Sequence, residues 1–151
     1  MVEKIIRPSV VLIKGTKILL LKSKYSSGEF YLLPGGGNEG FETIEETAIR
    51  ETKEETGYDI RIEKLLYLSE WIEKKRNKNV LYIIFLGKIK GGKETHLNDP
   101  CLEKDNIQAI EWVEVKDLNK IKFYPEKIIP YLQKDSLKKF SNDAIFINSK
   151  F

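Results

Sequence analysis

Residues 34–57 read PGGGNEGFETIEETAIRETKEETG, and they combine a glycine-rich loop with a helix whose two ends are marked in the sequence. Thr43 and Glu46 have the T-x-x-E spacing of a capping box, so the helix is predicted to begin at Thr43. Gly57 stands where helices often end in a left-handed residue. The apolar run FYLL at 30–33 comes just before the loop. We therefore predict a strand, a glycine loop and a helix in succession.

The loop glycines Gly35, Gly37 and Gly40 fit the G-x-G-x-x-G pattern of dinucleotide-binding loops. In such loops the helix begins inside the glycine turn, so that its amides face the pyrophosphate. Here the capping box places the helix start beyond Gly40, and Glu39 and Glu42 would bring negative charge to a phosphate. A phosphate-binding P-loop is also unfavourable, because no Lys-Ser or Lys-Thr pair follows the last glycine.

Three glutamates of the predicted helix lie on one side of it. At ~100° per residue, Glu51, Glu54 and Glu55 fall within roughly 100° of one another. Like charges at this spacing repel, and a divalent cation among their oxygens would make the cluster favourable. The glycine loop can bring Glu39 and backbone carbonyls to the same place. The alternative is an ordinary solvated acidic face. The adjacent sector of the helix is predicted to face the core, through Ala48, Ile49, Thr52 and Thr56.

Residues 36–58, GGNEGFETIEETAIRETKEETGY, closely resemble the Nudix box, G-x5-E-x7-R-E-U-x-E-E-x-G-U with U apolar. The sequence matches seven fixed positions of the box, namely Gly36, Glu42, Arg50, Glu51, Glu54, Glu55 and Gly57. It departs from the usual pattern at Thr52 and Tyr58, which fill apolar positions, and at Phe41, where a glycine is common. The first two positions are structural in the family, so they bear on helix packing and not on the chemistry.

The resemblance implies a reaction and its metal ligands. Nudix hydrolases use a metal-activated water to attack a diphosphate that is joined to another group, usually a nucleoside. By position, Glu51, Glu54 and Glu55 would bind Mg²⁺, or Mn²⁺ in its place, with the backbone carbonyl of Gly35 or Gly36 completing the shell. The expected function is therefore cleavage of the pyrophosphate linkage of a nucleoside diphosphate derivative.

The other roles also follow from the resemblance. Arg50 would orient the glutamates by charged hydrogen bonds, and Glu42 would brace the junction of loop and helix. The base would be one of the box glutamates or Glu103, which lies in a long loop beyond the box. A catalytically silent nucleotide sensor is the main alternative function, and an acidic interaction helix on an inert scaffold is another.

Substrate recognition is expected to involve residues outside the box. Tyr31 stands where many family members carry Trp, and Arg7 and Lys22 could steer phosphates. Further aromatic residues could stack a base, although strand aromatics mostly belong to a core: Tyr67, Trp71 and Tyr82. The substrate stays open among nucleoside triphosphates, ADP-ribose, nucleotide sugars and dinucleoside polyphosphates.

The rest of the chain indicates a mixed α+β fold, and the resemblance implies an α/β/α sandwich with a mixed sheet between helices. The expected helices span 43–57 and 124–134, and the expected strands span 9–14, 17–22, 30–33, 58–72, 80–89 and 107–115. We expect a single Nudix domain over 1–140 and a C-terminal tail over 141–151.

The composition limits the partners and the compartment. With 151 residues and a net charge of +3, the chain has the size of one domain and shows no basic stripe for nucleic-acid binding. No apolar run is long enough to cross a membrane. The single cysteine, Cys101, suits a reducing cytoplasm. The expected partner is a small nucleotide, and a homodimer stays open as an assembly.

Overall fold

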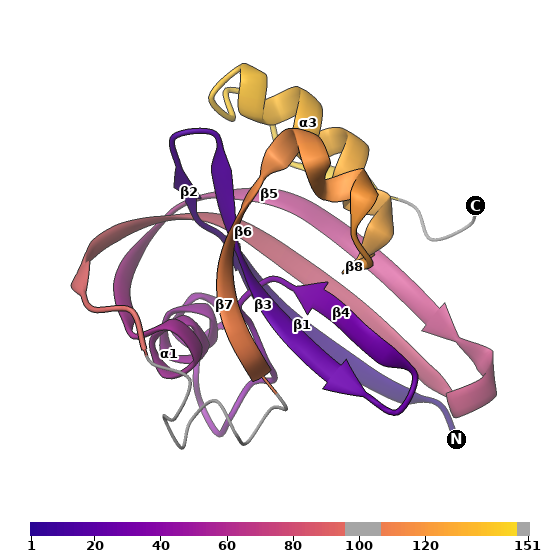
Figure 1. The fold of residues 1–151 in the computed structure, drawn as a ribbon. Coiled ribbons are helices and arrows are strands. Elements are labelled where there is room, and N and C mark those ends of the chain that lie inside the picture. The colour runs from indigo at the N-terminus through magenta and orange to yellow at the C-terminus, as the bar shows by residue number, and fades with distance from the viewer. Residues whose placement is uncertain (96–106, 148–151) are drawn as a thin grey trace.

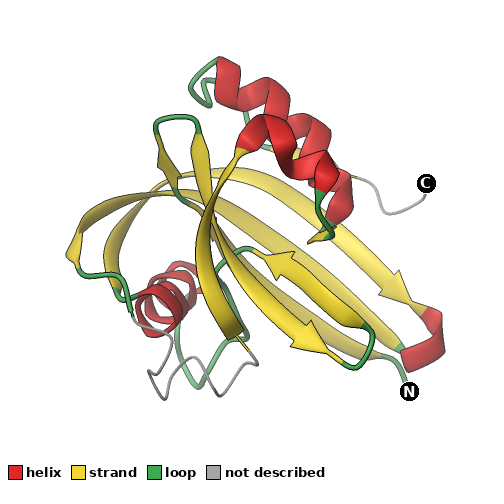
Figure 2. Ribbon diagram, viewed as in Figure 1, coloured by secondary structure: helices red, strands yellow, loops and turns green. Residues whose placement is uncertain are grey.

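The structure is a computed structural model, and it describes residues 1–95 and 107–147. Two β-sheets are flanked by helices, as Figures 1 and 2 show. The helices are α1 (Ile44–Thr56) and α3 (Ile129–Leu137), with short 3-10 turns η1 (Lys74–Arg76), η2 (Val115–Lys120) and η3 (Glu126–Ile128). The strands are β1 (Glu3–Val11), β2 (Ile13–Lys14), β3 (Lys17–Tyr25), β4 (Gly28–Leu32), β5 (Tyr58–Glu73), β6 (Lys78–Gly92), β7 (Ile107–Glu114), β8 (Phe123–Tyr124) and β9 (Ile145–Ile147).

Both sheets mix parallel and antiparallel pairs. In the described residues, one sheet runs in the order β1-β6-β5-β9, with β1 parallel to β6 and β5 antiparallel to it. The other sheet runs in the order β2-β3-β4-β8, and β7 also pairs with β3. The segment after residue 141 contributes β9, which pairs in parallel with β5. The predicted α+β class is confirmed.

The core has two parts, one on either side of the strands. Ala48 of α1 packs into one cluster of buried side chains, and Leu132 of α3 packs into the other. The two helices accordingly lie on opposite sides of the sheets in Figure 1, which is the α/β/α arrangement that the family resemblance implies. Tyr67 of β5 fixes α3 in place, because its buried hydroxyl donates to Asp135 Oδ2 over 2.6 Å. Burial, reinforced by Asp135, raises the pKa of Tyr67, so the phenol keeps its proton.

The predicted ends of α1 are confirmed. Glu46 N donates to Thr43 Oγ1 over 3.1 Å, and Thr43 N donates to Glu46 Oε2 over 2.9 Å, so the capping box is formed. Gly57 ends the helix with a φ of 82°. A Cβ atom at this glycine would lie 2.1 Å from Lys93 O, so both the backbone angle and the close approach require glycine.

The predicted core face of α1 is wrong at two positions. Ile49 is 37% exposed, whereas Glu55, which we placed beside the core, is only 2% exposed. The helix packs on β1 and β5 through small residues instead, because Thr47, Ala48, Thr52 and Thr56 let the backbones approach closely. The buried face therefore lies about one residue further around the helix than apolar content alone indicates.

The predicted start of the C-terminal helix is also wrong. We expected a helix from residue 124, but Phe123–Tyr124 form β8, which pairs in parallel with β4, and α3 begins only at Ile129. Pro130 explains the difference, because proline is tolerated in the first turn of a helix but not in its interior.

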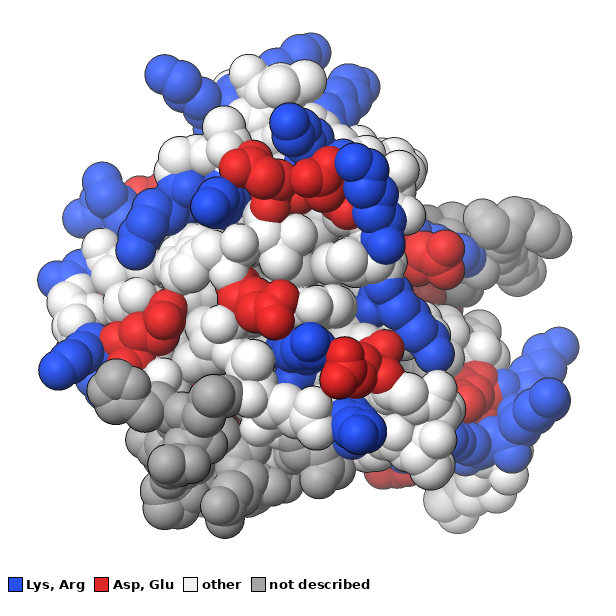
Figure 3. Space-filling view, in the orientation of Figure 1, with Lys and Arg blue, Asp and Glu red and all other residues white. Residues whose placement is uncertain are grey.

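Charged side chains are dispersed over the visible surface. On the face shown in Figure 3, Lys and Arg side chains alternate with Asp and Glu side chains among the described residues. Within 1–95 and 107–147, no helix is long and apolar enough to cross a membrane.

Candidate active site

The glycine loop lies between β1 and α1. Gly36 N donates to Pro8 O over 3.2 Å, and Arg7 Nη2 donates to Gly35 O over 3.1 Å. On the other side, Gly35 N donates to Glu55 Oε1 over 2.8 Å. A Cβ atom at Gly36 would lie 2.4 Å from Glu51 Cδ, so the loop backbone directly contacts a box carboxylate. The glycines therefore allow the chain to pass against two glutamates of the helix.

Arg50 connects the glutamates to the loop. Its Nη1 atom donates to Glu51 Oε1 over 3.1 Å and to Glu54 Oε2 over 3.2 Å. Its Nε and Nη2 atoms both donate to the carboxylate of Glu42, and Nη2 also donates to Gly37 O over 3.2 Å. These are charge-assisted bonds from a planar donor, which fix orientation as well as adding energy. Arg50 therefore links Glu42, Glu51 and Glu54 to the loop by hydrogen bonds.

The three box glutamates differ in exposure. Glu55 is buried and holds the loop amide of Gly35, whereas the side chain of Glu54 is 43% exposed and that of Glu51 is nearly buried. Glu39, the additional acid from the loop, is exposed and lies 3.9 Å from Arg50 Nη1. The carboxylates of the site therefore range from the buried Glu55 to the solvent-exposed Glu54 and Glu39.

The donors suit a divalent cation, although a complete metal site is not formed. In the described part of the chain, no three acidic, histidine or cysteine side chains converge as a ready-made metal site. Instead, one nitrogen of Arg50 is shared by Glu51 and Glu54. Glu51, Glu55 and the Gly36 backbone nevertheless line one cavity, and carboxylate and carbonyl oxygens are the ligands that Mg²⁺ and Mn²⁺ accept. The chemistry of the donors therefore fits the cation.

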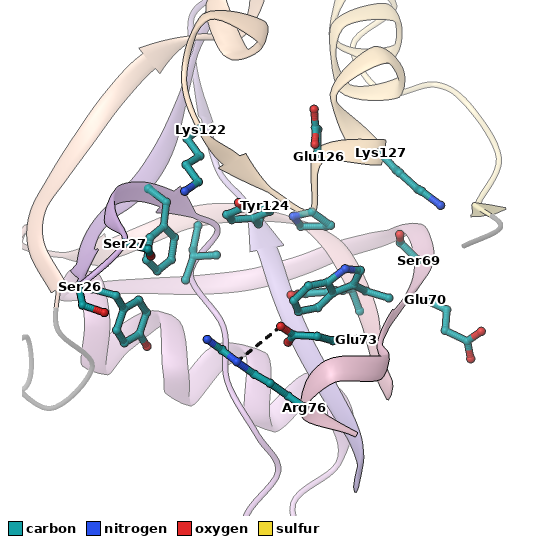
Figure 4. A pocket seen from close by; sticks show the side chains of 16 residues that line it. Ser26, Ser27, Ser69, Glu70, Glu73, Arg76, Lys122, Tyr124, Glu126 and Lys127 are labelled. Carbon is teal, nitrogen blue, oxygen red and sulfur yellow. Dashed lines mark ion pairs between the residues drawn. The ribbon is translucent and has the colours of Figure 1, made fainter. Parts of the chain in front are cut away.

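Two cavities lie near the box, and of the three box glutamates Glu51 and Glu55 line the first of them. The first, the box cavity, has a volume of about 250 Å³ and is lined by Arg7, the loop glycines, Glu51 and Glu55. The second, the aromatic pocket, has a volume of about 640 Å³ and is shown in Figure 4. Tyr25 and Leu32 line both. The two cavities are therefore neighbours that share part of their walls.

The aromatic pocket is built by strands from both sheets. Its aromatic side chains are Tyr25, Phe30, Trp71, Tyr82 and Tyr124. Tyr25 and Phe30 stack with their ring centroids 5.1 Å apart, and Tyr124 meets Phe30 edge-on. At the rim, Arg76 Nε lies 3.5 Å from Glu73 Oε1, the ion pair drawn in Figure 4. Such a pocket suits a flat ring with a few polar groups.

The structure brings some of the predicted substrate contacts to these cavities and not others. Arg7 lines the box cavity, and Trp71 and Tyr82 line the aromatic pocket, but Tyr67 belongs to the core. Tyr31 and Lys22 line neither cavity: the Tyr31 hydroxyl donates to Glu111 Oε2 over 2.9 Å. Lys22 pairs with Glu29 and Glu111.

The alternation of side chains along the strands explains why Tyr31 and Lys22 do not line the two cavities. Their neighbours Leu21, Ser23 and Leu32 line the box cavity, and successive strand side chains point to opposite faces. Tyr25 and Phe30 were missed although they closely precede the box, because the sequence does not show which face of their strands adjoins a cavity. Tyr124 is distant in sequence and comes beside them through the pairing of β4 with β8. Glu103, the proposed additional acid, lies outside the described residues.

The ion pair between Glu42 and Arg50 gives a pH-dependent prediction. The hydrogen bonds from Arg50 lower the pKa of Glu42 from 4.5 to about 2. A lowered pKa in the folded state stabilises the fold above pH 4.5 and loses this contribution as the pH falls toward 2. We expect wild type to melt above Glu42→Gln at neutral pH, with a gap that narrows between pH 4.5 and 2. Thermal melts of both proteins across this range measure the gap; a constant gap would contradict the assignment.

Comparisons with known proteins agree with this site. A family model described as the NUDIX domain matches residues 5–133. The ADP-ribose pyrophosphatase of Methanocaldococcus jannaschii is 33% identical over 117 residues, which is 77% of this chain and 65% of that protein. The chain thus spans less than two thirds of that relative's length.

Solved structures share the fold at lower sequence identity. A UDP-X diphosphatase matches with a TM-score of 0.72 and 16% identity, covering 97% of this chain and 68% of that one. A NUDIX hydrolase from Nitrosomonas europaea matches with a TM-score of 0.72 and 18% identity, covering 91% and 90% of the two chains. Because the family match covers most of the sequence and includes the whole box, the chain belongs to the Nudix family.

Proposed function

We propose that the protein is a Nudix pyrophosphohydrolase that cleaves the diphosphate linkage of a nucleoside diphosphate derivative. The observation that carries this proposal is the neighbouring position of two cavities with complementary chemistry, which share Tyr25 and Leu32 in their walls. The box cavity offers carboxylates, Arg7 and a glycine backbone, and the aromatic pocket beside it offers stacking surfaces. A substrate with a diphosphate and an attached ring needs both the charged cavity and the stacking surfaces.

The box residues would hold Mg²⁺, with Mn²⁺ as a substitute. Glu51, Glu54 and Glu55 would supply carboxylate oxygens, and the backbone of Gly36 would supply a carbonyl oxygen. When bound, such a cation neutralises phosphate charge and lowers the pKa of a coordinated water. Members of the family generally use divalent ions, which supports this assignment.

The chain's own residues would position the substrate around that ion. Arg50 keeps Glu51 and Glu54 together through one nitrogen, and Glu55 holds the loop amide of Gly35. Arg7 lines the box cavity from the opposite side, where its guanidinium can pair with a phosphate oxygen. The archaeal relative is named for ADP-ribose, a nucleoside diphosphate joined to a sugar, and we propose this class of substrate here.

A hydrolysis panel tests the proposal. We expect release of a nucleoside monophosphate from ADP-ribose, nucleotide sugars or dinucleoside polyphosphates, or of pyrophosphate from nucleoside triphosphates, only when Mg²⁺ or Mn²⁺ is present. The same ions should raise the melting temperature of the substrate-free protein by mass action. Nucleotide binding without turnover by any member of the panel would favour a silent sensor, and neither binding nor turnover would exclude both functions.

A further inference from the structure

A row of three side chains connects the box cavity to the aromatic pocket. Arg7 of β1 is in register with Tyr82 of β6, which is in register with Ser69 of β5. Residues opposite one another on neighbouring strands project from the same face of a sheet. Arg7 lines the box cavity, whereas Tyr82 and Ser69 line the aromatic pocket, and Figure 4 labels Ser69 on its strand beside the pocket. The row therefore follows the path that a substrate would take from diphosphate to ring.

Both hydroxyl groups of this row are open to a ligand. Tyr82 is 8% exposed and Ser69 is 2% exposed, so each is mostly enclosed by protein. Within the described residues, neither side-chain hydroxyl makes a hydrogen bond. The fully buried side-chain oxygens without partners in this part of the chain belong to Thr52 and Asn142, so the hydroxyls of Tyr82 and Ser69 keep some accessible surface. That surface faces the pocket they line.

The electrostatic surroundings of Tyr82 suit a neutral hydrogen-bonding group. Burial raises the pKa of its phenol, Arg7 lowers it and Glu73 raises it again, so the group keeps its proton at neutral pH. Tyr82 can then both donate and accept a hydrogen bond, as can Ser69. Because Tyr82 and Ser69 are in register on neighbouring strands and both line the pocket, a ligand with two adjacent hydroxyls can bridge their side chains.

We propose that Tyr82 and Ser69 bind the 2′,3′-diol of a substrate ribose and so select ribonucleotides over 2′-deoxyribonucleotides. This inference rests on the proposed function for the position of the diphosphate beside Arg7. A site that hydrogen-bonds a substrate hydroxyl discriminates against the analogue that lacks it, because the protein group is then left without a partner. Tyr82 and Ser69 are therefore specificity-determining residues and not members of the catalytic cluster.

Binding and turnover test the proposal separately. Calorimetry without added metal compares ADP with 2′-deoxy-ADP, and hydrolysis with Mg²⁺ compares two pairs: ADP-ribose with its 2′-deoxy-adenosine analogue, and ATP with dATP. We expect wild type to prefer the ribose form by roughly tenfold in Kd, and in kcat/KM for the pair it hydrolyses, which is the effect of one hydrogen bond. Tyr82→Phe should reduce this preference to within about twofold, mainly by weakening the ribose form, and Ser69→Ala should reduce it in the same direction.

The control is Tyr131→Phe, which removes the same hydroxyl from a tyrosine of α3 that does not line the pocket. This variant should keep the wild-type preference. Failure to hydrolyse any nucleotide, with the preference for ADP retained in calorimetry, would reject the proposed function and keep this inference. A wild type without a ribose preference, a Tyr82→Phe variant that keeps it while folded, or no binding of either nucleotide would overturn the inference.

Discussion

Replacing Glu54 with glutamine is expected to lower kcat at saturating Mg²⁺ by several hundredfold, on the order of 4 kcal/mol in the barrier. Loss of a carboxylate ligand would shift or empty a metal position that serves both the water and the phosphate. Folding should be nearly unaffected, because the side chain is 43% exposed and its ion pair is with Arg50 at the surface of α1. Exposed pairs of this kind contribute only about 0–1 kcal/mol.

Glu45→Gln is the matched control for this prediction. Glu45 is an exposed glutamate in the first turn of the same helix, so its replacement makes an identical change of charge at the other end of α1. Both variants should melt within about 2 °C of wild type without metal, and only Glu54→Gln should lose turnover. Equal activity of the two variants would show that Glu54 is part of an ordinary acidic surface and would remove it from the proposed site.

Glu55→Gln is a less direct test of metal binding than Glu54→Gln. The sequence places Glu55 on the strip with Glu51 and Glu54, next to the sector of the helix that was predicted to face the core. In the structure it is 2% exposed and accepts a hydrogen bond from the amide of Gly35. Glu55→Gln would therefore change the loop and the cavity together, so a loss of activity in that variant would not separate ligation from positioning.

The box was readable from the sequence because its constraints are local. The capping box, the Gly57 cap and the i, i+3 and i+4 spacing of the glutamates depend only on helix geometry, and each is present in the structure. The error at Ile49 has a tertiary cause. Strands β1 and β5 meet the helix on its threonine face, and no local pattern shows which face that will be.

The aromatic pocket could not be predicted from local sequence patterns. Its lining combines Tyr25, Trp71 and Tyr124, which are far apart along the chain and meet only through the pairing of β4 with β8 and the packing of the two sheets. Strand alternation decides which of two neighbouring aromatics faces a cavity, and a shift of one residue reverses the answer. This is why Phe30 lines the pocket and Tyr31, next to it, lines neither of the two cavities.

The second large effect is expected for Gly36→Ala, which should lower kcat about hundredfold while the protein stays folded. The added Cβ atom would lie 2.4 Å from Glu51 Cδ, so the carboxylate must move. Because that carboxylate is the far end of a flexible side chain, it can give up its hydrogen bond to Arg50 and rotate away at less expense to the fold than a backbone atom could. A catalytic group displaced by about 1 Å can lose about hundredfold in rate. Turnover and melting temperature, measured together, separate these two effects.

The neighbouring glycines make this prediction specific. A Cβ atom at Gly35 would lie 2.3 Å from the backbone carbonyl of Pro8, which cannot rotate away, so Gly35→Ala should destabilise the fold by about 1–3 kcal/mol. A Cβ atom at Gly37 meets nothing within 4 Å, so Gly37→Ala should change stability by about 0.5 kcal/mol or less and turnover far less than Gly36→Ala. Three identical methyl additions at successive positions thus have three different outcomes. If Gly36→Ala behaved like Gly37→Ala, the position of Glu51 against the loop would be unimportant for turnover, and Glu51 would not be a ligand of the reacting centre.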